Sequence, residues 1–270
     1  MSRHLLLAAL LAVACSPLWA QTEPAALDAE ALLIKVESKM YSPKAAGLTS
    51  VRLHVSMPMI DTMLGGGKIM FYWQAAKEGA AQKDKSAIKI EGGGEMAANP
   101  MIAGMIKKID MGFGKMFSGG ATGSDLETIR KHATLSATES EGKYILTVKR
   151  KADAPEDVFL VDSVMTISKD YVVEKAIAKV DDQLTETTPV FKALEDGKLL
   201  TIGYKMSAPL TGENEIAMVY EQQDKLWLPA KIVNKIVQSG MEVELLFKDY
   251  EINKAIDPKV FEEEGKEGGK

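Results

Sequence analysis

The chain has 270 residues, of which 46% are hydrophobic, 26% charged and 6% aromatic, and its formal net charge is -5. This profile fits one large or two small folded domains, and it disfavours a disordered chain, a collagen-like repeat and a polytopic membrane protein. Lys and Arg together number 33 against 38 for Asp and Glu, so nucleic acid is not expected to be the principal partner.

The N-terminus has the pattern of a secretory signal. Arg3 and His4 precede an apolar run at residues 5–14, which is too short to span a bilayer. Cleavage after Ala20 would remove a signal peptide, residues 1–20, and release a periplasmic protein. Alternatively, residues 11–15 resemble a lipobox, and Cys15, the single cysteine, would be lipidated and would anchor the protein to an envelope membrane. An exported chain of about 250 residues can fold without disulfides.

The first predicted element of the mature chain is a helix that begins at Asp28 and ends near Tyr41. Asp28 is a good N-cap, and Leu27 and Leu32 occupy the two positions of a hydrophobic staple. The apolar stripe continues at helical spacing through Leu33, Val36 and Met40.

Most of the remaining chain predicts strands. Apolar and polar residues alternate in several segments, as a strand with one buried face requires, and turn-forming residues separate these segments. We expect about eleven strands, near residues 49–57, 67–76, 85–91, 132–138, 143–150, 158–167, 171–180, 199–206, 215–223, 226–237 and 240–250. No periodic helix separates the last pairs, so neighbouring strands are expected to form antiparallel hairpins.

One insertion interrupts this pattern with a second helix, predicted near residues 99–118. Asn99 is a good N-cap, Pro100 suits the first helical position, and an apolar stripe follows: Ile102, Ile106, Ile109, Phe113 and Met116. Three glycines weaken this helix, and glycine clusters at 65–67, 92–94 and 119–120 flank the region. A weak apolar helix between flexible joints is a candidate lid over a hydrophobic cavity.

Methionine is concentrated in the same region. Nine of the fourteen methionines that follow Met1 lie between positions 57 and 116. Flexible, polarizable side chains suit a surface that accommodates several apolar shapes. Two other interpretations remain open: these side chains fill an irregular core, or the lysine-flanked helix lies on a membrane surface.

Catalytic and metal-binding motifs do not emerge from the sequence. The two histidines of the mature chain, His54 and His132, lack partners at metal-ligand spacing, and no serine stands in a GxSxG elbow. The glycines before Lys68 are not followed by the Ser or Thr that a phosphate-binding loop requires. Asp181 and Asp182 are expected in a solvated turn. The sequence therefore predicts a protein that is not an enzyme and holds no metal or cofactor.

Several segments resemble the outer-membrane lipoprotein-sorting proteins, the superfamily of the periplasmic carrier LolA and the receptor LolB. The resemblance covers most of the mature chain in arrangement: an N-terminal helix after the signal, a strand at residues 51–55 and a long meander. Its specific part is residues 226–229 (Leu-Trp-Leu-Pro) and the closing segment 247–258, followed by Phe261. The resemblance implies an α+β, mostly β fold: an incomplete antiparallel β-barrel of about eleven strands with helices covering the concave face.

The same resemblance implies a single half-barrel domain over residues 21–261, with a Met/Gly-rich insertion near 58–120 and a disordered tail at 262–270. It implies a carrier-like protein that holds the acyl chains of lipoproteins or other lipids, with peripheral membrane contact. The alternative is an envelope interaction or sensor protein that binds a protein partner with the same fold. Residues expected to line the cavity and its cover are Val51, Leu53, Val55, Met57, Met70, Tyr72, Ile102, Met105, Ile106, Ile109, Phe113 and Met116.

Overall fold

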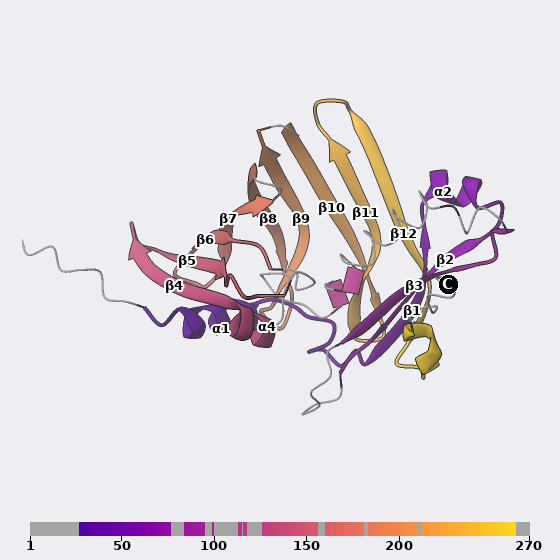
Figure 1. Cartoon of the computed structure of the whole chain (residues 1–270), viewed down its shortest axis with the longest axis horizontal. Helices are drawn as coiled ribbons and strands as arrows, with labels where there is room; N and C mark the ends of the chain where they lie inside the picture. Colours follow the sequence, from indigo (N-terminus) through magenta and orange to yellow (C-terminus); the bar gives the residue numbers. More distant parts are fainter. Residues whose placement is uncertain are drawn as a thin grey trace, which may run out of the picture.

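The computed structural model describes residues 27–76, 84–94, 99, 113–114, 116–117, 126–155, 160–180, 183–209 and 212–262. In these residues one antiparallel sheet of twelve strands dominates the fold (Figure 1). The strands are β1 (Ser50–Ser56), β2 (Lys68–Gln74), β3 (Lys85–Glu91), β4 (Ala133–Ser140), β5 (Lys143–Arg150), β6 (Ser163–Ile167), β7 (Val173–Val180), β8 (Gln183–Ala193), β9 (Leu199–Ala208), β10 (Gly212–Gln223), β11 (Leu226–Ile236) and β12 (Met241–Ile252). The helices are α1 (Ala29–Lys39), α2 (Pro58–Met63), α4 (Leu126–His132) and the 3-10 turn η2 (Pro258–Phe261).

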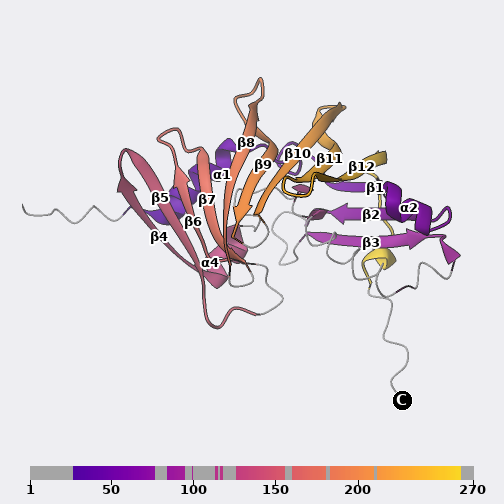
Figure 2. The same ribbon diagram turned by 90° about the horizontal axis from the view of Figure 1, so that it is seen from above.

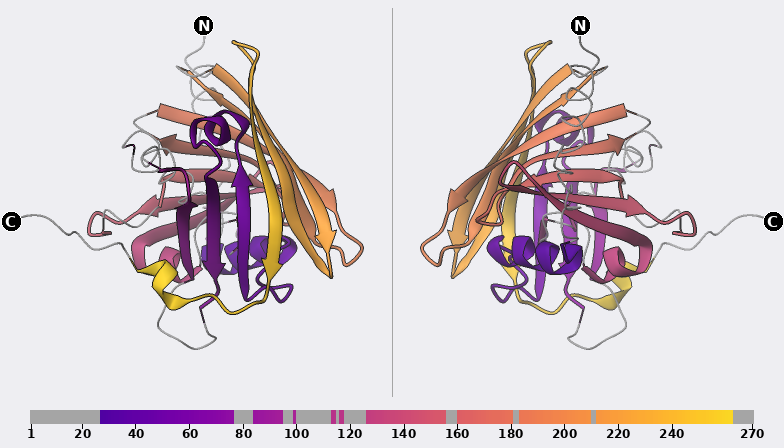
Figure 3. Two further views of the ribbon diagram at one scale, coloured as in Figure 1. Left: turned by 90° about the vertical axis from the view of Figure 1, so that its right-hand side faces the viewer. Right: turned by 90° about the vertical axis from the view of Figure 1, so that its left-hand side faces the viewer.

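The sheet is a meander with one long-range closure. From β4 to β12, each strand pairs with the next strand in sequence, and β12 then pairs with β1, which continues to β2 and β3. The strands β3 and β4 form the two edges, so the sheet stays open. Figure 2 shows it extending from β4 at one end to β3 at the other, and Figure 3 shows that the strand direction turns strongly between these ends.

The first helix forms where the sequence predicts it. Asp28 is its N-cap, and the Asp28 carboxylate accepts a hydrogen bond of 2.9 Å from the backbone N–H of Ala31. Leu32, Leu33 and Val36 are buried, as the apolar stripe requires. These observations confirm both the start of the helix and its buried face.

Each of the eleven predicted strands is present, and β8 is an additional strand. Thr185, Thr187 and Pro189 of β8 point to the same side of the sheet as the hydrophobic residues of β7 and β9 with which they pair. These three β8 residues are not the β-branched aliphatic or aromatic residues that usually mark a buried strand in a sequence. Proline inside a run also disfavours a strand prediction, because proline cannot donate to the ladder. The strand is therefore held by its position between β7 and β9 and not by its own hydrophobic pattern.

Strand register places one continuous row of side chains along one face of the sheet. Directly paired residues point to the same side, and the successive partners across β4 to β10 are Ala137, Leu146, Met165, Ala176, Thr187, Met206 and Asn214. From β10 the same face continues through Met218, Ile232 and Leu245. We call this side the inner face.

Two hydrophobic clusters pack on the inner face, one at each end of the sheet. The first, here the α1 cluster, joins Leu33 and Val36 of α1 and Ile129 of α4 to Leu146 and Val148 of β5. The second, here the β1 cluster, joins strands β1, β2, β11 and β12 to Phe113 and Phe117. In Figure 1, α1 and α4 lie beside β4 and β5, far from β1 to β3.

The opposite side, here the outer face, carries ion pairs between neighbouring strands. Lys231 pairs with Glu244 between β11 and β12, and Lys175 pairs with Glu186 between β7 and β8 at 2.5 Å. Because successive strand residues point to opposite sides, this charged ladder and the apolar inner face come from the same strands.

Two of the glycine clusters allow two backbone segments to lie very close together. A Cβ atom added to Gly67 would lie 2.7 Å from the Cα of Gly93, which is closer than real Cβ contacts allow. Lys68 and Glu91 pair beside this point, at the ends of β2 and β3. The clusters at 65–67 and 92–94 thus meet at one end of the β2–β3 pair, a packing role that the sequence prediction of flexible joints did not include.

Several sequence predictions fall outside the described residues. These are the signal segment 1–20 with Cys15, most of the predicted helix 99–118, the Asp181–Asp182 turn, and the tail beyond Glu262. None of the described helices is long and apolar enough to cross a membrane.

Candidate functional site

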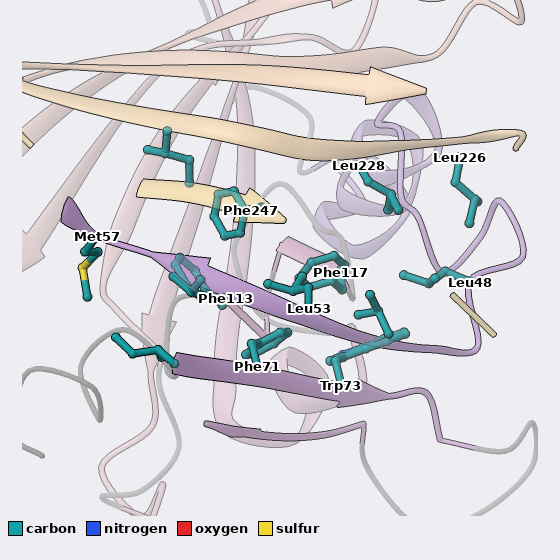
Figure 4. Packing of buried hydrophobic residues seen from close by; sticks show 14 of the residues in the cluster. Leu48, Leu53, Met57, Phe71, Trp73, Phe113, Phe117, Leu226, Leu228 and Phe247 are labelled. Carbon is teal, nitrogen blue, oxygen red and sulfur yellow. The ribbon is translucent and has the colours of Figure 1, made fainter. Parts of the chain in front are cut away.

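Six of the predicted site residues pack into the β1 cluster or against it. Val51, Leu53 and Val55 are 0% exposed on the inner face of β1, and Met57 follows them. Phe113 is 6% exposed in the same cluster, and Met116 is partly buried against it. Figure 4 shows Phe113 and Phe117 lying over the side chains of β1 and β2.

Contacts between aromatic rings stabilise the β1 cluster. The Phe113 ring meets Phe71 edge-on at 5.8 Å between ring centroids, and it meets Phe247 of β12 at 5.1 Å. Phe117 stacks on Phe71 at 5.5 Å and lies 6.1 Å from Trp73. Such pairs add about 0.5–1.5 kcal/mol each beyond the area that they bury. The segment at Phe113 and Phe117 thus covers the β1, β2 and β12 end of the inner face.

Two predicted residues of β2, Met70 and Tyr72, belong to the outer face. They pair with His54 and Arg52, whereas Phe71 pairs with Leu53 of the β1 cluster. The structure therefore separates Met70 and Tyr72 from Val51, Leu53 and Val55, because a period of two sends neighbouring residues to opposite sides. The predictions for Ile102, Met105, Ile106, Ile109 and Cys15 lie outside the described residues.

Tyr72 takes part in a polar network on the outer face. Its hydroxyl donates to the Glu91 carboxylate at 2.6 Å, and Arg52 contacts the same carboxylate at 3.2 Å and Glu251 at 3.0 Å. The hydrogen bond from Tyr72, followed by the one from Arg52, lowers the pKa of Glu91 below its ordinary value. Burial raises the pKa of Tyr72, and the hydrogen bond to Tyr72 raises the pKa of Arg52.

The described cavities lie away from the centre of the inner face. One, of about 210 Å³, is lined by Arg52, Tyr72 and Glu251 and by residues 254–257 before η2. Another, of about 470 Å³, lies between the start of α1 and the edge strand β4. Arg52 of the first cavity is already paired with Glu251, so this cavity is a paired polar surface and not a free charged site.

Sequence reasoning missed a part of the inner face that begins at the β1 cluster and extends over β9 to β12. Its side chains are half buried except Ile232, which is buried in the β1 cluster. Ile216, Met218 and Leu245 pack against that cluster. We call this surface the central inner face: Tyr204, Met206, Asn214, Ile216, Met218, Tyr220, Ile232, Asn234 and Leu245. The alternation of apolar and polar residues in β9 and β12 predicts strands, but it does not by itself predict a binding surface.

Charge separates the two sides of these strands. In β10 the inner positions are Asn214, Ile216, Met218 and Tyr220, and none is charged, whereas Glu213 and Glu215 take outer positions. The same division holds in β11, where Ile232 is inner and Lys231 is paired on the outer face. An uncharged stripe therefore continues along the inner face from the β1 cluster.

Tyrosines in this region remain neutral. Burial raises the pKa of Tyr204, Tyr220 and Tyr250. The Tyr41 hydroxyl accepts a 2.8 Å hydrogen bond from the backbone N–H of Trp227, and the Tyr250 hydroxyl donates to the carbonyl of Pro229. Because a raised tyrosine pKa favours the protonated phenol, these side chains present neutral rings and hydroxyls at physiological pH.

Histidine and carboxylate positions do not form a metal site in the described part of the chain. His54 Nδ1 lies 3.7 Å from Asp249 Oδ2, and no group of three or more potential ligands comes together among the described residues. What the described surface offers chemically is binding area, with neutral hydrogen-bonding groups at a few points.

No family model matches the chain, and none of the curated proteins matches it by sequence. Solved structures match it at low identity and low TM-score. A candidate outer membrane lipoprotein-sorting protein domain from Vibrio parahaemolyticus matches 86% of this chain and 95% of its own, at 11% identity and a TM-score of 0.36. A DUF1329 family protein from Desulfovibrio piger matches 87% of this chain and 95% of its own, at 10% identity and a TM-score of 0.34. At these scores neither match identifies a function.

Proposed function

We propose that this protein is a non-catalytic, carrier-like protein of the bacterial envelope that binds acyl chains of lipoproteins or other lipids. The sheet acts as a half-barrel, and its inner face receives the hydrocarbon. One observation supports this proposal: the side chains of the central inner face are uncharged and, apart from Ile232, only half buried, while outer positions of β10 and β11 carry charge.

Hydrocarbon transfer gives such a surface enough affinity for a carrier. Each methylene moved from water into an apolar environment contributes about 0.8 kcal/mol, so a chain of ten covered methylenes gains on the order of 8 kcal/mol before the costs of binding. Met206 and Met218 suit this task, because flexible thioether side chains adapt to chains of different shape. Binding of this kind requires contact area and not a tightly shaped pocket.

Some of the residues that the sequence predicts for the site lie at the β1 end of this surface. Val51, Leu53 and Val55 form the floor of the β1 cluster, and Phe113 and Met116 belong to the segment packed on it. We propose that an acyl chain on the central inner face ends against this aromatic wall.

Paired variants on β10 test the proposal. Met218 is half buried on the inner face, and its neighbour Val219 is 50% exposed on the outer face. Delipidated wild-type protein should bind a fluorescent fatty-acid probe, and protein from its native envelope should carry acyl lipids that mass spectrometry detects in the organic extract. Met218→Asp should weaken probe binding at least tenfold, because a charge would lie on the hydrocarbon path.

Val219→Asp is the matched control, with the same substitution one residue away on the opposite face. It should bind the probe like the wild type, and thermal unfolding of both variants would show that the sheet is intact. Equal probe affinity in the two variants, or no bound lipid and no probe binding in the wild type, would contradict the proposal.

A second candidate, an envelope interaction protein, is supported by an apolar row on the outer face. Val190 and Ala217 both pair with Gly203 of β9, and Val219 is the next outer residue of β10. Val190 is 37% exposed, so this row offers a small apolar contact to a protein partner. Loss of a stoichiometric partner in Val219→Asp, with probe binding absent throughout, would favour this candidate over the carrier.

A further inference from the structure

Two asparagine oxygens on the central inner face are buried without a hydrogen-bond partner. Asn214 lies on β10 and Asn234 on β11. In the described structure, the Oδ1 atoms of both side chains are buried and accept no hydrogen bond. An amide oxygen that has lost water and gained no donor destabilises the fold, so two such atoms on adjacent strands require an explanation.

Register makes the two asparagines neighbours. Asn214 pairs with Ile236, and Asn234 pairs with Ile216, so the two amides are diagonal neighbours on one face of β10 and β11. Residues in this relation have Cα atoms about 7–8 Å apart, within reach of one small polar group between their side chains.

The surroundings of the pair are apolar. On β9, Asn214 pairs with Met206, and on β12, Asn234 pairs with Val243. Every cross-strand partner of the two asparagines is therefore Met, Ile or Val, and no charged side chain opposes either amide. A charged ligand group would lose its hydration here without gaining a counter-ion, so the complementary group is a neutral donor.

We propose that Asn214 and Asn234 anchor the polar end of an acyl amphiphile whose first polar group donates an N–H or O–H hydrogen bond. The hydrocarbon then extends along the central inner face over Ile216, Met218 and Leu245. This inference rests on the proposed function and narrows its ligand to acyl amides or alcohols. A plain ester has only acceptor oxygens at this position, and it leaves both asparagine oxygens unsatisfied.

Two probes of equal chain length test the anchor: N-dodecylacetamide, which carries one N–H, and dodecyl acetate, which carries none. Each would compete with a fluorescent fatty acid bound to the delipidated full chain. The wild type should bind the amide up to about tenfold more tightly than the ester, the factor expected of one added hydrogen bond. The double variant Asn214→Leu, Asn234→Leu should bind both probes with the affinity that the wild type has for the ester.

Stability of the unliganded protein separates an anchor from a structural role. Leucine removes the unsatisfied oxygens, so the double variant should have a melting temperature at least as high as that of the wild type. Gln222→Leu, the same kind of change at an exposed position of β10, is the control and should leave the preference for the amide unchanged.

The outcomes distinguish this inference from the proposed function. Equal affinity of the wild type for amide and ester would overturn the anchor and leave acyl-chain binding intact. A lower melting temperature in the double variant, with equal loss of both probes, would make the asparagines structural and also overturn the anchor. If the wild type binds neither the fatty acid nor the two probes, the proposed function fails and the inference fails with it.

Discussion

Glu91 shows how a single side chain connects three strands at the edge of the sheet. Its carboxylate on β3 accepts from Tyr72 on β2 and contacts Arg52 on β1, which also reaches Glu251 on β12. The Glu91 side chain is 45% exposed, so solvent screens these contacts and their combined contribution is modest. The network orders the outer face of β1 to β3, and it explains why Tyr72, predicted as a cavity residue, is engaged elsewhere.

Replacing Glu91 with glutamine should reduce stability in a pH-dependent way. The pKa of Glu91 is lowered in the folded protein, so its stabilisation is present above the unfolded pKa of about 4.3 and is lost as pH falls through the folded pKa. At pH 7 we expect Glu91→Gln to cost about 0.5 kcal/mol in urea unfolding, and at pH 3 a smaller difference. Glu215→Gln, at an exposed position of β10, controls for the loss of one charge. A difference that stays constant between pH 7 and pH 3 would contradict this assignment.

At the scale of elements, the segment that carries Phe117 acts as a packed cover of the β1 end. Phe117 is 1% exposed, lies on Phe71 and Trp73, and its carbonyl accepts a 3.3 Å hydrogen bond from the backbone N–H of Lys44. A ring placed in this way removes the inner face of β1 and β2 from water. The cover is thus fixed by aromatic contacts at one end of the sheet.

Phe117→Ala should therefore destabilise the protein by about 3–5 kcal/mol, the cost of removing a buried aromatic ring. Urea unfolding, followed by tryptophan fluorescence because Trp73 lies against this ring, would measure the loss. Met116→Ala, at a half-buried neighbouring position, should cost clearly less. A loss below about 1 kcal/mol in Phe117→Ala would show that the segment does not cover the cluster.

The elements differ in how far their sequences predict them. Asp28 and the stripe from Leu32 to Val36 define α1 locally, because a cap and a helical period are both short-range signals. β8 escapes prediction because Thr185, Thr187 and Pro189 occupy successive inner positions, so the neighbouring strands specify most of it. The sequence does not predict the central inner face for a related reason. Asn214 and Asn234 become neighbours only through the register of β10 with β11, and single-strand periodicity does not contain that register.

At the scale of the whole molecule, the described residues form two separate hydrophobic clusters and not one continuous core. The α1 cluster and the β1 cluster share no residue. Between them, strands β8 and β9 are joined mainly by backbone pairing and by half-buried side chains. Stability should therefore differ along the sheet, since local unfolding free energies follow local burial.

Leu146→Ala should loosen one end of the molecule and leave the other unchanged. Leu146 is 0% exposed in the α1 cluster, and its truncation should cost about 2–5 kcal/mol. In native-state hydrogen exchange, amides of β4 to β7 should then exchange faster while those of β1 and β2 keep their rates. Phe71→Ala, in the β1 cluster, is the reciprocal control and should give the opposite pattern. Uniform acceleration across all strands in both variants would show that the sheet unfolds as one unit.

The pairing of β1 with β12 also sets the order in which the chain can fold. Arg52 contacts Glu251, 199 residues later, whereas β4 to β12 grow by adjacent hairpins. Closing so large a loop costs more conformational entropy than closing a local hairpin. Contacts of this kind are therefore expected to form late and to slow folding. β1, β2 and β3 can pair with one another as the chain is synthesised, but the other edge of β1 has no partner until residues 241–252 have been made. The N-terminal hairpins can therefore complete the sheet only after nearly the whole chain has been made.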